Sequence, residues 1–216
     1  MLTVGVGALV ASPAAQATQA TQATQAPTAT ELAARLQKRY ESIRDFTADF
    51  TQTFQGLLVK RPTTERGKIL LKKPSRVRFT YEKPEPKVFV SNGVVFRSYS
   101  PIDRSGTETP LATGDDVSTA LLFLAGRGNL TRDFTSKIAS GAPAGEWHLG
   151  LVPKSKQADF DTLTLFVDAR TLALLGFTTT DEQGNNTIRF SNLKENPGLT
   201  DRAFDFEFPK GTAISR

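Results

Sequence analysis

The sequence has 216 residues, no cysteine, one histidine, 15 phenylalanines and a formal net charge of +5. This length suits one domain whose core is rich in phenylalanine rings. The lack of cysteine excludes disulfides, thiolate metal sites, a cysteine nucleophile and a lipid-modified cysteine. The basic residues are dispersed on alternating positions, which does not favour nucleic acid and indicates a solvated face or an acidic protein partner.

The first 30 residues are expected to lie outside the folded domain. Residues 1–17 are apolar and end in Ala15-Gln16-Ala17, as a secretory signal peptide does, and they are too short to span a bilayer as a helix. The usual basic leader is missing, so either the true start lies upstream or the segment has a role other than export. Residues 18–30 repeat Thr, Gln and Ala, which predicts a disordered linker before a domain over 31–216.

The domain is predicted to open with a helix and a strand. Thr28 and Glu31 have the spacing of a capping box, and apolar residues then follow one helical stripe, which predicts a helix over 31–44. From Phe46 apolar and polar residues alternate, as in a strand with one apolar face. A polar loop is expected over 56–66.

A meander of antiparallel strands is predicted over 67–101. Apolar and basic residues alternate on both sides of Pro74, and Asn92-Gly93 supplies the residues of a tight hairpin turn. The chain then reads as irregular to residue 114, and residues 115–125 predict a second helix that is apolar on nearly all sides and therefore buried.

The second half of the chain predicts further short strands joined by hairpins. These strands are expected over 134–139, 146–153, 162–168, 174–180, 187–193 and 204–208. Many short strands with two substantial helices favour a mainly β (α+β) fold with a strongly curved antiparallel sheet or barrel.

The residues that could support catalysis or metal binding have simpler explanations. His148 is the only histidine, and it lies in a predicted strand with no nucleophile-elbow pattern in the sequence. The acidic pairs Asp115-Asp116 and Asp159 with Asp161 lack calcium-loop spacing and suit helix starts and turns. Gly126 and Gly128 lack the strand and helix that flank a phosphate-binding loop. We therefore expect no enzyme activity, cofactor or metal.

The order of several motifs resembles the LolA-type periplasmic outer-membrane lipoprotein carrier proteins. These motifs are Lys-Lys-Pro-Ser-Arg-Val-Arg-Phe-Thr-Tyr at 72–81, Ser-Asn-Gly at 91–93, Tyr-Ser-Pro at 99–101, Asp-Glu-Gln-Gly-Asn at 181–185 and Phe-Asp-Phe-Glu-Phe-Pro-Lys-Gly at 204–211. The resemblance covers about Leu32 to Ile214. It implies an unclosed β-barrel of about 11 strands, with helices as a lid over an apolar cavity.

On the residues alone, the phenylalanine-rich face would be the ordinary core of a β protein. The resemblance implies instead that it leaves space for lipid chains when the second helix moves. The residues expected to line the lipid-binding cavity are Leu36, Phe50, Ile69, Leu71, Val77, Phe79, Tyr81, Val88, Val90, Phe96, Leu121, Leu163, Leu165, Val167, Phe177, Ile188 and Phe190.

The resemblance also implies a contact that holds the lid shut. In these carriers an arginine before a proline bonds to backbone carbonyls on the covering helices, and the matching residue here is Lys73, with Tyr40, Leu124 and Ala125 at the lid positions. An ammonium lacks the planar fork of a guanidinium, so closure is expected to be weaker or to use Arg76. Relatives usually place a large aromatic residue at the position of Arg97, so we expect that end of the cavity to differ.

The resemblance implies a periplasmic monomer that carries acylated lipoproteins. It would take them from an inner-membrane transporter and deliver them to an outer-membrane acceptor, without stable insertion into either membrane. Two alternatives remain: a related module that binds a glycolipid or phospholipid or senses lipoprotein stress, and an esterase-like enzyme that depends on His148.

Overall fold

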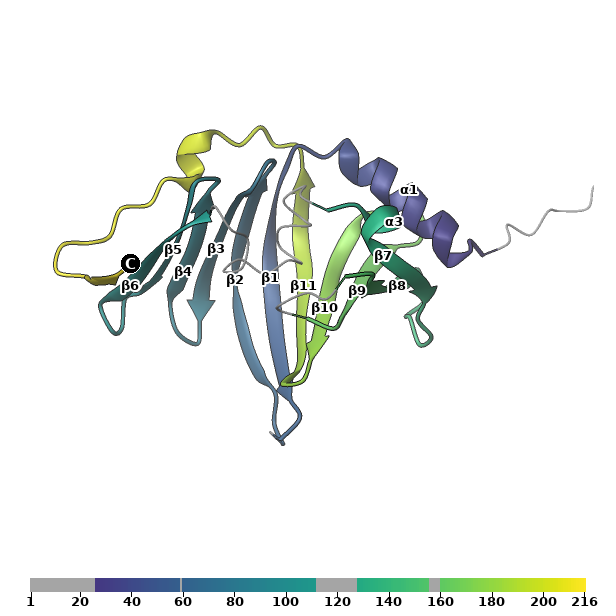
Figure 1. Ribbon diagram of the computed structural model, residues 1–216, viewed down its shortest axis with the longest axis horizontal. Helices are drawn as coiled ribbons and strands as arrows, with labels where there is room; N and C mark the ends of the chain where they lie inside the picture. Colours follow the sequence, from purple (N-terminus) through teal and green to yellow (C-terminus); the bar gives the residue numbers. More distant parts are fainter. Residues whose placement is uncertain (1–25, 59, 112–127, 156–159) are drawn as a thin grey trace, which may run out of the picture.

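The computed structural model describes residues 26–58, 60–111, 128–155 and 160–216. Its strands form one twelve-stranded sheet in the order β12-β6-β5-β4-β3-β2-β1-β11-β10-β9-β8-β7. All neighbours are antiparallel except β12 and β6. The edge strands β12 and β7 lie at opposite ends of the sheet (Figure 1), so the predicted unclosed, mainly antiparallel sheet is confirmed.

The strands of the first half are β1 (Asp45–Gly56), β2 (Thr63–Lys72), β3 (Arg76–Lys83), β4 (Lys87–Asn92), β5 (Val95–Ser100) and β6 (Ser105–Pro110). The second half contributes β7 (Phe134–Ile138), β8 (Glu146–Pro153), β9 (Thr162–Asp168), β10 (Leu174–Asp181), β11 (Gly184–Glu195) and β12 (Ala213–Ser215). The helices are α1 (Ala29–Glu41), the short α3 (Leu130–Asp133) and the 3-10 helix η3 (Asp201–Phe204).

Helix α1 begins at the predicted capping box. The Glu31 carboxylate accepts hydrogen bonds from the Thr28 backbone and hydroxyl, and the Thr28 hydroxyl accepts from the Glu31 backbone N–H. The helix ends at Glu41, three residues earlier than predicted, and buries Leu32, Ala33 and Leu36. The amphipathic stripe therefore faces the sheet.

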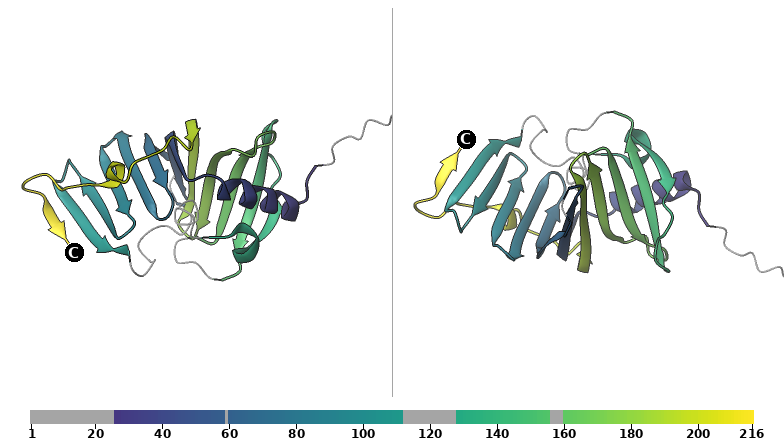
Figure 2. Two further views of the ribbon diagram at one scale, coloured as in Figure 1. Left: turned by 90° about the horizontal axis from the view of Figure 1, so that it is seen from above. Right: turned by 90° about the horizontal axis from the view of Figure 1, so that it is seen from below.

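The pairing register divides the sheet into two faces, because directly paired residues point to the same side. We call inner the face that carries Phe50, Phe79 and Leu165, and outer the opposite face. Helix α1 and the inner-face side chains belong to one hydrophobic core, and α1 lies across the β7–β11 side of the sheet (Figure 2). Within the described residues, no helix covers the inner face of β3–β6.

The C-terminal segment, residues 196–216, which we call the strap, runs across the outer face of β2–β6. It ends as β12 beside β6 (Figures 1 and 2). Asp201 pairs with Lys72 and Arg76 at 2.7 and 3.2 Å, and Phe204 is completely buried. The prediction of a strand over 204–208 is therefore wrong: these alternating phenylalanines belong to a strap that packs side chains on the sheet without pairing with it.

Three other boundaries differ from the expectations. Residues 105–110, predicted as irregular, form β6, and the predicted loop over 56–66 is shortened because β1 reaches Gly56 and β2 starts at Thr63. The three-residue β12 was not predicted. The predicted helix over 115–125 lies outside the described residues.

Candidate functional site

The inner face is a continuous apolar surface built by alternate residues of neighbouring strands. Phe50 packs edge-on against Phe79 and Tyr81, with ring centres 5.2 and 4.9 Å apart. The aromatic series continues through Phe89 to Phe96, because Phe89 lies 5.6 Å from Tyr81 and 6.2 Å from Phe96. Such a surface offers dispersion and hydrophobic burial to a ligand but no reactive group.

Most of the predicted cavity residues share this face. The residues with inner-face positions or packing in its core are Leu36, Phe50, Ile69, Leu71, Val77, Phe79, Tyr81, Phe96, Leu163, Leu165, Val167, Phe177, Ile188 and Phe190. Leu121 lies outside the described residues. Whether these side chains bind lipid stays a prediction.

The assignment of Val88 and Val90 to this face is wrong. Phe79 pairs directly with Phe89, so Phe89 shares its face and its two neighbours in β4 point to the outer side. Val90 is buried there under the C-terminal strap, since η3 packs on β3 and β4. Strand β4 is apolar on both sides, so alternation alone did not identify its inner residue.

The half of the inner face beneath α1 is closely packed. Two small gaps among the described residues measure about 20 Å³ between α1, α3 and β9–β10, and about 10 Å³ beside Tyr40 and Phe190. Two polar contacts also hold the C-terminal half of α1: Arg39 binds both carboxylate oxygens of Glu195 at 2.6 and 2.8 Å, and Gln37 accepts from the Leu130 backbone at 2.9 Å. An acyl chain that occupied this part of the core would have to displace side chains of α1.

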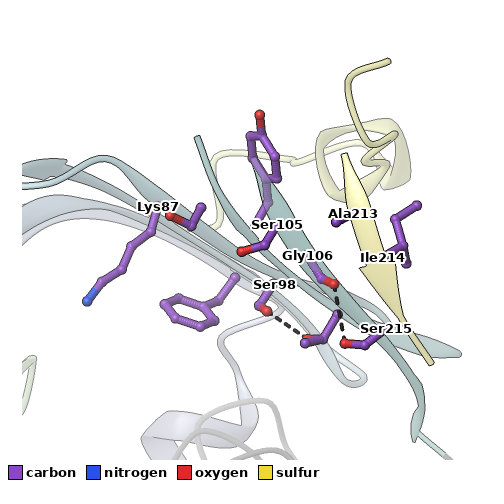
Figure 3. A pocket seen from close by; sticks show the side chains of 11 residues that line it. Lys87, Ser98, Ser105, Gly106, Ala213, Ile214 and Ser215 are labelled. Carbon is purple, nitrogen blue, oxygen red and sulfur yellow. Dashed lines mark hydrogen bonds between the residues drawn. The ribbon is translucent and has the colours of Figure 1, made fainter. Parts of the chain in front are cut away.

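The other half of the face carries a groove of about 450 Å³ across β4, β5, β6 and β12 (Figure 3). Its floor is made of small side chains, and Ser98 and Thr107 hydrogen-bond one another at 2.7 Å. Phe89 forms an apolar wall beside Lys87. The groove therefore exists because short hydroxyl residues occupy inner-face positions where β1–β3 carry large apolar ones.

A row of polar side chains borders the apolar surface on the side of the β1–β2 hairpin. Tyr81 donates to the Gln52 side chain, which in turn donates to Asn186 at 2.9 Å. Lys87 pairs with Glu65 at 2.6 Å and lies 4.4 Å from the Tyr81 ring centre. Burial, with a contribution from Glu65, raises the pKa of the Tyr81 hydroxyl, which therefore remains a neutral donor.

Lys73 and Tyr40, the two described residues of the predicted closing contact, lie together. The Lys73 ammonium donates to the backbone carbonyl of Tyr40 near the end of α1 and lies 3.8 Å from the centre of the Tyr40 ring. The Lys73 backbone N–H also donates to the Arg44 carbonyl at 2.8 Å. The predicted partners Leu124 and Ala125 lie outside the described residues.

Burial lowers the pKa of the Lys73 ammonium to about 8, and the Glu41 carboxylate opposes this shift only in part. The ordinary value of 10.5 applies to the unfolded chain. The folded state therefore binds fewer protons between these two values, and its stability rises with pH across this window.

We predict that wild-type protein gains stability relative to Lys73→Met as the pH rises from about 8 towards 10, by about 1–2 kcal/mol after allowing for the half-exposed side chain. Urea denaturation at several pH values would measure this difference. Lys68→Met is the control: its pairing with Asp49 raises the pKa of Lys68, so the stabilisation by that pair is lost only above about 10.5. A difference for Lys73→Met that does not change with pH would contradict the prediction.

Arg76 and Arg97, the two arginines considered for the closing contact and for one end of the cavity, both lie on the outer face. Arg76, the alternative to Lys73, pairs with Asp201 of the C-terminal strap. Arg97 shares the outer face with Val90 and pairs with Glu108 at 2.7 Å, so the expectation that it alters one end of the cavity is wrong. The pairing register between β4 and β5 decides on which face Arg97 lies, and the sequence pattern does not reveal that register.

His148 lies on the outer face beside Phe166, with its Nε2 3.1 Å from the Glu146 carboxylate, which Arg189 also binds at 2.9 Å. The Arg189 guanidinium stacks 3.9 Å from the Phe166 ring centre. These contacts give His148 a structural role. In the described part of the chain, no three Asp, Glu or His side chains gather as a metal site would require, and no helix has the length and apolar character needed to cross a membrane.

The comparisons with known proteins agree with this architecture. A family model described as outer membrane lipoprotein carrier protein LolA matches residues 41–207. The outer-membrane lipoprotein carrier protein of Cupriavidus pinatubonensis is 29% identical over 197 residues, covering 88% of this chain and 90% of that protein. The protein of the same name from Methylococcus capsulatus is 30% identical over 183 residues, covering 84% and 86%.

Among solved structures, an uncharacterized conserved protein from Thermus thermophilus has a TM-score of 0.53 at 13% identity, covering 85% of this chain and 96% of that one. At this identity the likeness shows the fold alone. The family model covers β1 to β11, from the last residue of α1 to the strap on the outer face of the sheet. The chain therefore belongs to the LolA family of outer-membrane lipoprotein carrier proteins.

Proposed function

We propose that this carrier holds the acyl chains of its lipoprotein cargo against the inner face, receives cargo from an inner-membrane transporter and passes it to an outer-membrane acceptor. Its family membership makes it a periplasmic, non-enzymatic carrier of outer-membrane lipoproteins. The observation that carries the proposal is the inner face itself: it is apolar from β1 to β4 and from β8 to β11, and its β4–β12 side contains a groove of about 450 Å³.

The affinity of such a site must stay moderate, because a carrier has to release its cargo. Burying a sixteen-carbon chain at ~0.8 kcal/mol per methylene would contribute ~13 kcal/mol, and several chains would exceed the practical limit of non-covalent binding. Displacing α1 would offset part of this gain, since α1 buries Leu32 and Leu36 in the same hydrophobic core as the inner face. We infer that cargo and α1 compete for the same apolar surface.

Lys73 is the residue through which we propose to test this competition. Its ammonium contacts both the Tyr40 carbonyl and the Tyr40 ring, so it favours the position of α1 seen here. A hydrogen bond from a charged group contributes about 1.5–3 kcal/mol. Arg39 and Glu195 provide a second contact, so the loss of Lys73 weakens the closed arrangement without abolishing it.

We predict that Lys73→Leu loads lipoprotein more tightly and transfers about tenfold less of it to the acceptor than wild type, because a contact made only by the closed state is removed. The measurement is the fraction of cargo transferred from preloaded carrier to the outer-membrane acceptor. Lys68→Leu changes an outer-face lysine of β2, the strand that ends just before Lys73, and should transfer like wild type. Equal transfer by all three proteins would remove Lys73 from the mechanism.

A further inference from the structure

The β1–β2 hairpin ends in two exposed leucines. Leu57 is 71% exposed and Leu58 is 98% exposed, whereas most large apolar side chains in the described residues are at least partly buried. This hairpin extends beyond the neighbouring strand ends on its side of the sheet (Figure 1). Neither leucine contributes to the core, so folding does not explain their presence.

The leucines are held in place by paired backbone. Strands β1 and β2 pair up to Phe54 and Thr63, and Gly56 pairs with Gly184 of β11. The Leu57 backbone N–H donates to the Gln183 carbonyl at 3.0 Å, which fixes the start of the turn on the β10–β11 hairpin. The apolar side chains are therefore presented at a defined end of the sheet.

Two exposed cations follow the leucines. Lys60 and Arg61 form no ion pair with another described residue. On the adjacent turn, the Asp181 carboxylate accepts hydrogen bonds from the backbone N–H groups of Gln183 and Gly184. Glu182 is exposed. The hairpin tip itself thus carries two cations, next to a turn that carries two carboxylates.

We propose that this hairpin tip contacts an anionic phospholipid bilayer, with Leu57 and Leu58 entering the interface and Lys60 and Arg61 lying among the headgroups. A specific protein interface needs about 800 Å² from each partner, which two leucines at a turn do not supply. Interfacial binding needs only a small apolar insertion supported by nearby cations. The contact would be weak and reversible, as a carrier between two membranes requires.

The absence of native cysteine permits a local test. Leu58→Cys in the full chain is labelled with an environment-sensitive fluorophore and mixed with vesicles of phosphatidylethanolamine and phosphatidylglycerol, without cargo or other proteins. Val94→Cys is the matched control, because Val94 is 71% exposed in the β4–β5 turn at the opposite end of the sheet. Both proteins keep the same N-terminal residues and the same overall charge.

We expect a blue shift and increased intensity at position 58 and little change at position 94. Adding Leu57→Ser should weaken vesicle binding about tenfold. Adding Lys60→Gln and Arg61→Gln should weaken it about fivefold for each charge on anionic vesicles, and much less on vesicles in which phosphatidylcholine replaces phosphatidylglycerol.

The proposal is overturned by equal changes at both positions, which would indicate adsorption without orientation, by no change at position 58, or by a change that appears only when an acceptor protein is reconstituted in the vesicles. Because the test uses empty carrier, these outcomes leave the proposed cargo site on the inner face unaffected.

Discussion

Phe204→Ala is expected to lower the free energy of unfolding by about 3–5 kcal/mol, as removal of a fully buried aromatic side chain does. Phe204 has no exposed surface and belongs to the strap that crosses the outer face. The backbone beside it is fixed by Arg78, which donates to the carbonyls of Ala203 and Asp205 at 3.2 and 3.4 Å. The strap therefore has little freedom to fill the space that the ring leaves.

The control for this prediction is Phe206→Ala, two residues along the same strap. Phe206 is half-buried and contacts Tyr99 and Phe208, with ring centres 5.8 and 5.4 Å apart, so its removal should cost about 1–2 kcal/mol. Urea denaturation followed by circular dichroism would measure both values. Equal losses for the two variants would mean that η3 does not anchor the strap.

The strap also shows where sequence patterns mislead. Phe204, Phe206 and Phe208 alternate with polar residues as a strand would, but alternation reports only that one side of an extended chain is buried. The buried side here packs across the sheet, and only the last residues pair with β6. Conversely, the residues of β6 are polar or small on both sides, so this strand has no apolar alternation to predict it.

The features that were predictable depend on local rules. The capping box at Thr28 predicted the start of α1, because it involves residues only three positions apart. The membership of most strands in a curved antiparallel sheet followed from the period of two. The contact between Lys73 and Tyr40 was expected from the family resemblance, since nothing in the local sequence brings residues 33 positions apart together.

Register was the information that the local rules did not contain. In β4 the residues Val88, Phe89 and Val90 are all apolar, so either face could have been the inner one. The pairing of Phe89 with Phe79 decides the question, and it depends on the exact length of the turns at both ends of the strand. The same uncertainty placed Arg97 near the cavity, whereas it lies on the outer face with Val90.

The two neighbours Val88 and Phe89 therefore provide a matched pair for the cargo site. We predict that Phe89→Glu lowers lipoprotein loading about a hundredfold or more, because a carboxylate on an apolar binding surface must lose its hydration when an acyl chain covers it. Phe89 is only half-buried, so the folded sheet can accommodate the change. Val88→Glu adds the same charge one residue away, on the outer face, and should load normally.

An ion pair between Lys87 and the new glutamate at position 89 has to be excluded from this comparison. The Lys87 ammonium lies 5.9 Å from the centre of the Phe89 ring, so a glutamate at position 89 could pair with it and recover part of the binding. Phe89→Ser removes the apolar wall without offering Lys87 a partner, and it should also load poorly. The measurement is the amount of cargo bound per folded carrier, with melting temperature as the check on folding. Normal loading by Phe89→Glu and Phe89→Ser together would show that the groove beside β4 does not hold the acyl chains, and would direct the search to the surface beneath α1.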